Sequence, residues 1–197
     1  MKILGLTGGM GMGKSTVAAM LERAGMPVFD ADAQVRRLPS EPGPVLSAMT
    51  NLGPDARHGG RLDRAALRGA VMARPQLLAQ LEALIHPQVR RARARFLACH
   101  RKRGTRWVVL DIPLLFETGA GRLCAHVLGV SAPRWVQARR VAARRGMTQA
   151  EARKLMARQM PDAHRRLRAD TVLHTGGALD DTRRQVRQFV RKRFARR

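Results

Sequence analysis

Glycines, a lysine and a hydroxyl stand close together near the N-terminus, and their spacing is typical of phosphate binding. Gly8 is followed after four residues by Gly13, Lys14 and Ser15, which matches the pattern G-x-x-x-x-G-K-[ST]. In this pattern backbone N–H groups surround the phosphates, the lysine reaches the β and γ oxygens, and the hydroxyl binds magnesium. A helix that begins near Lys14 adds the positive end of its dipole. The predicted nucleotide-binding residues are Gly8, Gly9, Gly11, Met12, Gly13, Lys14, Ser15 and Thr16.

Carboxylates follow two other apolar runs. Asp30 and Asp32 end the stretch VFDAD, at the strand edge where open α/β sheets hold ligands. On an extended chain the two would point the same way. One of them can accept the proton of an attacking hydroxyl, or both can be helix caps or turn formers. Because Asp32 is the more C-terminal, it is predicted to project further into the cleft and to act as the base.

Asp111 ends the apolar run in VVLDIPLLFE, as the magnesium-binding aspartate of a Walker B element does. It is predicted to hold the metal directly or through water, with Ser15 as the second ligand. Glu117 is a second acidic candidate for the region around the metal, and a side chain with no role there is the equal alternative. The sequence therefore predicts ATP with Mg²⁺.

The elements that position these residues alternate between strands and helices. Five short apolar runs predict buried strands at residues 2–6, 26–30, 106–112, 125–130 and 170–173. Helical segments lie between them, and the first, at 14–24, ends at Gly25. Strands separated by helices form parallel sheets covered on both faces. The predicted fold is an α/β, P-loop NTPase-type, doubly wound sheet of five parallel strands.

Two longer segments interrupt this alternation within one domain of 1–197. The core is predicted to comprise about 1–32, 105–132 and 169–197, and a mostly helical insertion that helps to bind a ligand is predicted at about 33–104. Within it, residues 73–100 show helical periodicity that Pro87 interrupts.

A basic segment at about 133–168 is predicted to form a lid. Its first part reads as two helices around Gly146, and Thr148 and Glu151 have capping-box spacing. The hairpin either closes over phosphates or presents a solvated charged face.

The C-terminal segment is predicted to be a helix that packs on the core. It places Val186, Phe189, Val190 and Phe194 on one face.

The charge and composition narrow the function classes. The net charge is +24, whereas a triphosphate with a phosphorylated acceptor carries only about six to eight negative charges. The excess is expected to be a solvated arginine-rich surface. Tyrosine is absent, which argues against a stacking platform for single-stranded nucleic acid. Cys99 and Cys124 lack metal spacing and are expected to be reduced thiols of a soluble, cytoplasmic protein. The oligomeric state is open, with a monomer favoured.

Taken in order, several motifs resemble one kinase family. They are GLTGGMGMGKST, VFDAD, RLDRAALR, LIHPQVR, LDIPLLFE and the AD pair at 169–170. Together they resemble dephospho-CoA kinase across nearly the whole chain. The resemblance implies ATP-dependent phosphorylation of the ribose 3'-hydroxyl of dephospho-CoA, the last step of coenzyme A synthesis. The sequence departs from the family pattern at Met12, at Gln34 and Val35, and at His174 and Thr175.

The resemblance also implies residue roles. Asp32 matches the family's base, Lys14 its phosphate-loop lysine, and Arg140 a basic lid residue near the phosphates. The predicted substrate-binding residues are Asp30, Arg36, His86, Pro87, Arg90, Asp111 and Leu114. Two alternatives stay open: another P-loop kinase acting on nucleosides or nucleotides, and an ATPase stimulated by nucleic acid.

Overall fold

The computed structural model describes residues 1–38, 57–58, 61–62, 75–112, 114–157 and 159–194. The chain divides into two compact units, one comprising 1–29 and 100–197 and the other 30–99. Each unit is described by itself below.

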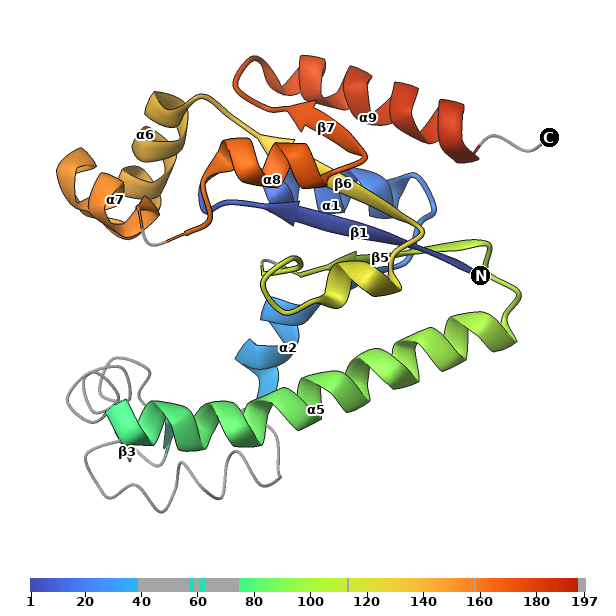
Figure 1. Cartoon of the computed structure of the whole chain (residues 1–197), viewed down its shortest axis with the longest axis horizontal. Coiled ribbons are helices and arrows are strands. Elements are labelled where there is room, and N and C mark those ends of the chain that lie inside the picture. The colour runs from blue at the N-terminus through green and yellow to red at the C-terminus, as the bar shows by residue number, and fades with distance from the viewer. Residues whose placement is uncertain (39–56, 59–60, 63–74, 113, 158, 195–197) are drawn as a thin grey trace. The chain divides into compact units, whose positions relative to one another are not determined.

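A five-stranded sheet forms the centre of the first unit, in the order β2-β5-β1-β6-β7 (Figure 1). Its strands are β1 Lys2–Gly8, β2 Val28–Asp30, β5 Trp107–Asp111, β6 His126–Ser131 and β7 Thr171–His174. β1 pairs in parallel with both β5 and β6, and β6 pairs in parallel with β7. This arrangement confirms the predicted α/β fold, with strand boundaries that differ from the prediction by one or two residues.

The apolar side chains of the central strands form the main core. Leu4, Leu6, Val109 and Leu128 are fully buried, as expected for strands of a parallel sheet that is covered on both faces. Helices α1 Lys14–Arg23 and α9 Leu179–Phe194 pack on this core. From α9, the residues Val186, Phe189, Val190 and Phe194 contact the core, so the predicted core-facing stripe of the last helix is confirmed. Residues 195–197 of that prediction lie outside the described residues.

The first helix begins at Lys14, next to Gly13, and ends just before Gly25, the glycine that was predicted to stop it. Gly13 is its N-cap and has a φ of 81°, and Gly25, just past its end, has a φ of 83°. Both values lie in the left-handed region that only glycine adopts at little cost. The helix ends at Arg23, one residue before the end of the predicted 14–24.

Three helices follow β6, where the sequence predicted two around Gly146. They are α6 Arg134–Arg145, α7 Gln149–Met156 and α8 Asp162–Arg168. Gly146 caps α6 with a φ of 61°, and Thr148 and Glu151 form the predicted capping box of α7. The first two helices pack together through a small core of their own, which includes Val141 and Met156. The third helix, α8, packs against β6.

The second unit contains helix α2 Ala31–Arg37, the short hairpin of β3 Arg57–His58 and β4 Arg61–Leu62, and most of helix α5 Pro75–Lys102. The prediction that Pro87 interrupts the helical pattern is wrong, because α5 continues through it. Proline removes one backbone N–H and thus one hydrogen bond, and the helix retains the bonds on either side. Most of the RLDRAALR motif, at 63–68, lies outside the described residues.

Within the described residues, no helix has the length and the apolar run that crossing a bilayer requires.

Candidate active site

The glycine-rich segment forms a loop between the central strand and the first helix. It begins where β1 ends at Gly8 and runs into Lys14, the first residue of α1. Gly11 has a φ of 75°, and a Cβ there would lie 2.7 Å from a methyl carbon of Val141. Both the backbone angle and the space therefore require glycine. The loop and the first turn of α1 present N–H groups that have no partners within a helix, which is the arrangement that binds phosphate.

Lys14 and Asp111 come together at the carboxyl ends of neighbouring strands. The Lys14 ammonium forms an ion pair with the Asp111 carboxylate, and both side chains are largely buried. Asp111 is the last residue of β5 and stands opposite Leu6 of β1 in the register. The structure thus brings together a phosphate-loop lysine and the aspartate predicted to bind metal. Ser15 and Thr16 follow Lys14 as exposed residues of α1.

Arg140 of α6 is tied to the loop and to the end of the last strand. Its Nη2 donates to the Thr175 carbonyl at 2.7 Å, and its Nη1 lies 3.5 Å from the Gly11 carbonyl and 3.3 Å from the Thr175 hydroxyl. The Thr175 hydroxyl in turn donates to the Met12 carbonyl at 2.6 Å. These bonds hold the loop in place, and contact between Arg140 and a phosphate stays a prediction.

Two glutamine side chains also hold the loop. Gln137 of α6 donates to the Met10 carbonyl at 2.6 Å, and the Met10 N–H donates to the Gln159 side chain at 2.9 Å. The backbone N–H and the carbonyl of Met10 are therefore both bound by residues of the predicted lid. The segment predicted to be a lid is thus hydrogen-bonded to the phosphate loop.

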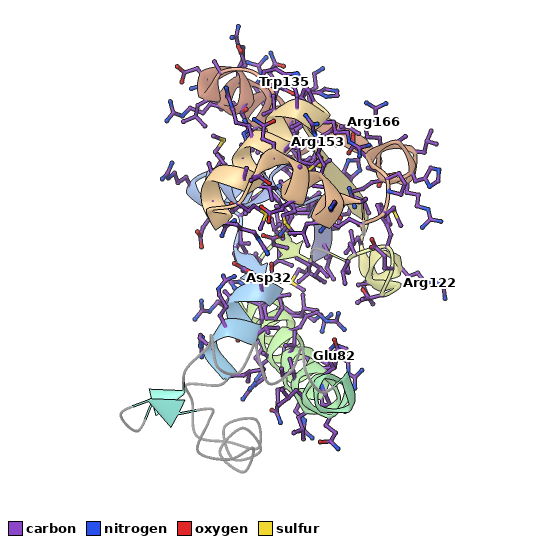
Figure 2. All side chains as sticks on the ribbon, turned by 90° about the vertical axis from the view of Figure 1, so that its left-hand side faces the viewer. Asp32, Glu82, Arg122, Trp135, Arg153 and Arg166 are labelled. Atoms are coloured by element: carbon purple, nitrogen blue, oxygen red, sulfur yellow. The ribbon has the colours of Figure 1, made fainter. Side chains whose placement is uncertain are left out.

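Asp30 and Asp32 do not share an extended chain. Asp30 ends β2 and is the N-cap of α2, where its carboxylate accepts the Ala33 N–H at 2.8 Å and lies 3.4 Å from Nη2 of Arg36. Asp32 lies within the first turn of that helix and is exposed (Figure 2). The expectation that the two point the same way is wrong, because the chain turns into a helix between them. Their roles as base and substrate ligand stay predictions.

The other predicted substrate-binding residues are divided between the two units. Arg36, His86, Pro87 and Arg90 belong to the unit 30–99, where His86 and Arg90 are exposed on α5. Leu114 belongs to the first unit and is 50% exposed, with its carbonyl accepting the Thr118 hydroxyl at 2.7 Å. Glu117 is also exposed in that unit. No contact with a substrate is assigned to any of them.

Sequence reasoning missed the residues that hold the loop. Thr175, Gln137 and Gln159 carry no motif of their own, although the departure of Thr175 from the family pattern marked its position. Arg165 of α8 was also missed, and its side chain is buried next to the loop. Such residues are found only when the fold brings distant segments together.

Comparison with known proteins decides the family. A model of the dephospho-CoA kinase family matches residues 2–181. The chain belongs to the dephospho-CoA kinase family. Two dephospho-CoA kinases illustrate the similarity. That of Gluconobacter oxydans is 48% identical over 196 residues, covering 98% of each chain. That of Paramagnetospirillum magneticum is 52% identical over 166 residues, covering 84% of this chain and 78% of its own.

Solved structures share the fold of this chain. A crystal structure from Thermus thermophilus has a TM-score of 0.80 at 40% identity and covers 98% of each chain. The dephospho-CoA kinase of Campylobacter jejuni has a TM-score of 0.73 at 20% identity, covering 98% of this chain and 97% of its own, and shows that the fold is shared. As a dephospho-CoA kinase family member, the chain is a kinase with a P-loop fold.

Proposed function

We propose that this chain transfers the terminal phosphoryl group of ATP to the ribose 3'-hydroxyl of dephospho-CoA, giving coenzyme A and ADP. The observation that carries the proposal is the phosphate loop with Lys14 and Asp111 at its base, in a chain that matches the family model from residue 2 to 181. In the reaction the bond from the γ-phosphorus to the ADP oxygen breaks, and a bond to the ribose oxygen forms.

The loop and Lys14 act on the phosphates. Backbone N–H groups of the loop and of the first turn of α1 hold the β-phosphate, and Lys14 places its positive charge where negative charge develops during transfer. Preorganised charge of this kind lowers the barrier because it needs no reorganisation during the reaction. Thr175, Arg140, Gln137 and Gln159 act through the loop by keeping its backbone in one arrangement.

The donor set fits magnesium. The ion prefers oxygen ligands and binds through one or two carboxylates together with substrate phosphates. The hydroxyl of Ser15, on the first turn of α1, and the carboxylate of Asp111, at the end of β5, supply such oxygens. When bound there, magnesium would neutralise charge on the phosphates. The ion pair with Lys14 holds the Asp111 carboxylate in position for binding magnesium.

Asp32 is the proposed general base. Its carboxylate is exposed on the first turn of α2, and within the described part of the chain it caps no helix and forms no ion pair, so it can accept the proton of the ribose hydroxyl. Asp30, by contrast, uses its carboxylate to cap the same helix. This difference supports Asp32 over Asp30 for the reaction.

A single-turnover assay with dephospho-CoA and ATP tests the proposal. General-base assistance is worth about a hundred- to ten-thousand-fold in rate, so Asp32→Asn should lose rate on that scale while it still binds both substrates. Asp30→Asn is the matched control, and it should lose less rate and some helix stability instead. A fast Asp32→Asn enzyme, or a slower Asp30→Asn enzyme, would contradict the assignment of the base.

ADP release also distinguishes the alternatives. Release that depends on dephospho-CoA supports the proposal, whereas release with nucleosides or nucleotides alone would favour another P-loop kinase. Stimulation by DNA or RNA would favour a nucleic-acid-dependent ATPase. A cytoplasmic location is part of the proposal because ATP is the phosphoryl donor.

A further inference from the structure

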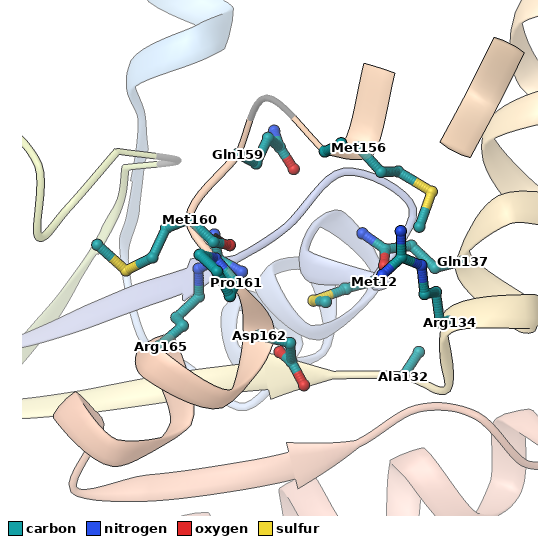
Figure 3. A pocket seen from close by; sticks show the side chains of 11 residues that line it. Met12, Ala132, Arg134, Gln137, Met156, Gln159, Met160, Pro161, Asp162 and Arg165 are labelled. Carbon is teal, nitrogen blue, oxygen red and sulfur yellow. Dashed lines mark hydrogen bonds between the residues drawn. The ribbon is translucent and has the colours of Figure 1, made fainter. Parts of the chain in front are cut away.

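Arg165 lines a pocket beside the phosphate loop. The pocket has a volume of about 390 Å³, and its walls include Met12 of the loop, Gln137 of α6 and Gln159 (Figure 3). Arg165 extends from α8 and is only 3% exposed. A buried arginine next to a phosphate-binding loop requires an explanation, because burying a cation is costly unless a counter-charge is present.

The guanidinium of Arg165 has donors that the described residues do not use. Its Nη2 donates to the Met160 carbonyl at 3.0 Å, which fixes the orientation of the group. Its Nε is buried and has no acceptor among the described residues. Asp162, one turn earlier on α8, uses its Oδ2 to accept the Ser131 hydroxyl at 2.7 Å, and the same oxygen lies 4.0 Å from Nε of Arg166. Its Oδ1 is buried and, like Nε of Arg165, has no hydrogen-bond partner among the described residues. Within the described part of the chain, Arg165 forms no ion pair.

The guanidinium lies directly against the start of the loop. A Cβ placed on Gly9 would be 3.2 Å from Nη1 of Arg165, so the absence of a side chain at Gly9 lets the two approach. Gly9 follows β1, and α8 packs against β6 on one side of that strand. On the other side of β1 stands β5, which carries the Asp111 partner of Lys14. Lys14 and Arg165 therefore flank the loop from two sides.

Arg140 differs from Arg165 in how its donors are used. The Arg140 guanidinium is bonded to the Gly11 carbonyl and to Thr175. It is engaged in holding protein groups. Arg165 retains unused donors in a preorganised position.

We propose that Arg165 contacts the terminal phosphoryl group of bound ATP. The proposal rests on the proposed function, in which the lysine of this motif reaches the β and γ oxygens. The phosphoryl oxygens supply the counter-charge that Arg165 lacks, and its Nη1 and Nε supply charge-assisted hydrogen bonds, which arginine forms well with phosphate. Arg165 is then a catalytic residue of this kinase, and the pocket is where it meets the nucleotide.

Calorimetric titration of the full chain with nucleotides and no acceptor tests this assignment. The ligands are magnesium complexes of ADP and of the β,γ-imido analogue of ATP. Arg165→Gln should bind the triphosphate about 10- to 100-fold more weakly, as expected for one hydrogen bond to a charged group, and ADP within about twofold of wild type. Single-turnover transfer should fall about a hundredfold. Arg153→Gln, which changes an exposed arginine of α7 (Figure 2), is the control and should bind both ligands as wild type does.

Equal losses of triphosphate and ADP affinity would overturn the proposal, because a structural arginine would not distinguish the two. Unchanged affinities and rate would also overturn it. If Arg165→Gln does not fold, the wild-type chain is measured by NMR, with the Arg165 Nε–H signal assigned by its loss in Arg165→Lys. That signal should shift with the triphosphate and not with ADP, and an unshifted signal refutes the contact. A wild-type chain that binds nucleotide but does not phosphorylate dephospho-CoA would refute the proposed function instead.

Discussion

Thr175→Val removes one hydroxyl at the point where the last strand meets the phosphate loop. Thr175 is buried, and its hydroxyl donates to the Met12 carbonyl at 2.6 Å. Valine keeps the shape and leaves that carbonyl without its donor, which costs about 1 to 3 kcal/mol. For a loss of about 2 kcal/mol, a chain of this size should melt roughly 4 to 8 °C lower. If bound ATP must then order the loop, about 1.4 kcal/mol of that cost corresponds to tenfold weaker ATP affinity.

Thermal unfolding and ATP titration measure the two effects separately, with Thr171→Val as the matched control. Thr171 is the first residue of β7, the strand that ends just before Thr175, and its hydroxyl hydrogen-bonds to His126 at 3.0 Å, away from the loop. The control should lose stability and keep its ATP affinity. An ATP affinity unchanged in Thr175→Val, or equally weakened in Thr171→Val, would refute the view that Thr175 holds the loop.

Three further predictions concern charged groups. Lys14→Ala should abolish transfer while the fold is retained, as a turnover assay and circular dichroism can check, and near-normal turnover would contradict the phosphate-loop assignment. Arg140→Ala should weaken ATP and ADP about equally, because it releases the loop from Thr175, and a loss confined to ATP in titrations would contradict this positioning role. Burial lowers the pKa of His126, opposed by Asp170 and assisted by Arg193. The unfolded chain therefore binds more protons, and the free energy of unfolding should fall as the pH drops through about 6.5. Urea unfolding at two pH values measures this fall in the free energy of unfolding, which should be smaller in His126→Asn than in the wild type. An equal fall in the two proteins would count against His126 as its cause.

The sequence predicted the sheet and the phosphate loop because their signals are local. Apolar runs bounded by glycines and prolines determined the five strands, and the loop motif lies within eight consecutive residues. Gly25 marked the end of the first helix through its own backbone preference. In each case a residue and its immediate neighbours determine the structure.

The errors arose where one residue type fits two structures. For Asp30 the sequence allows either an extended pair with Asp32 or a helix cap, because aspartate after a strand suits both, and the structure shows the cap, on α2. Pro87 was read as a break, but the 28 residues of α5 supply enough other hydrogen bonds to continue through it.

The long-range contacts of the site could not be predicted from spacing. Arg165 and Thr175 lie more than 150 residues from the loop in the chain, and each meets it only because β1, β6 and β7 are neighbours in the sheet. Among many arginines, none is marked by its sequence context as the one that will be buried.

The central position of β1 in the sheet has a consequence for how the enzyme is made. The ribosome produces β1 and its loop first, yet the two strands on either side, β5 and β6, begin at Trp107 and His126. The bond from Thr175 comes later still. Domains fold as units during synthesis, and pairings distant in sequence form slowly. The nascent chain therefore carries its phosphate loop without the structure that makes it bind, so nucleotide binding is acquired only after Thr175 has been synthesised.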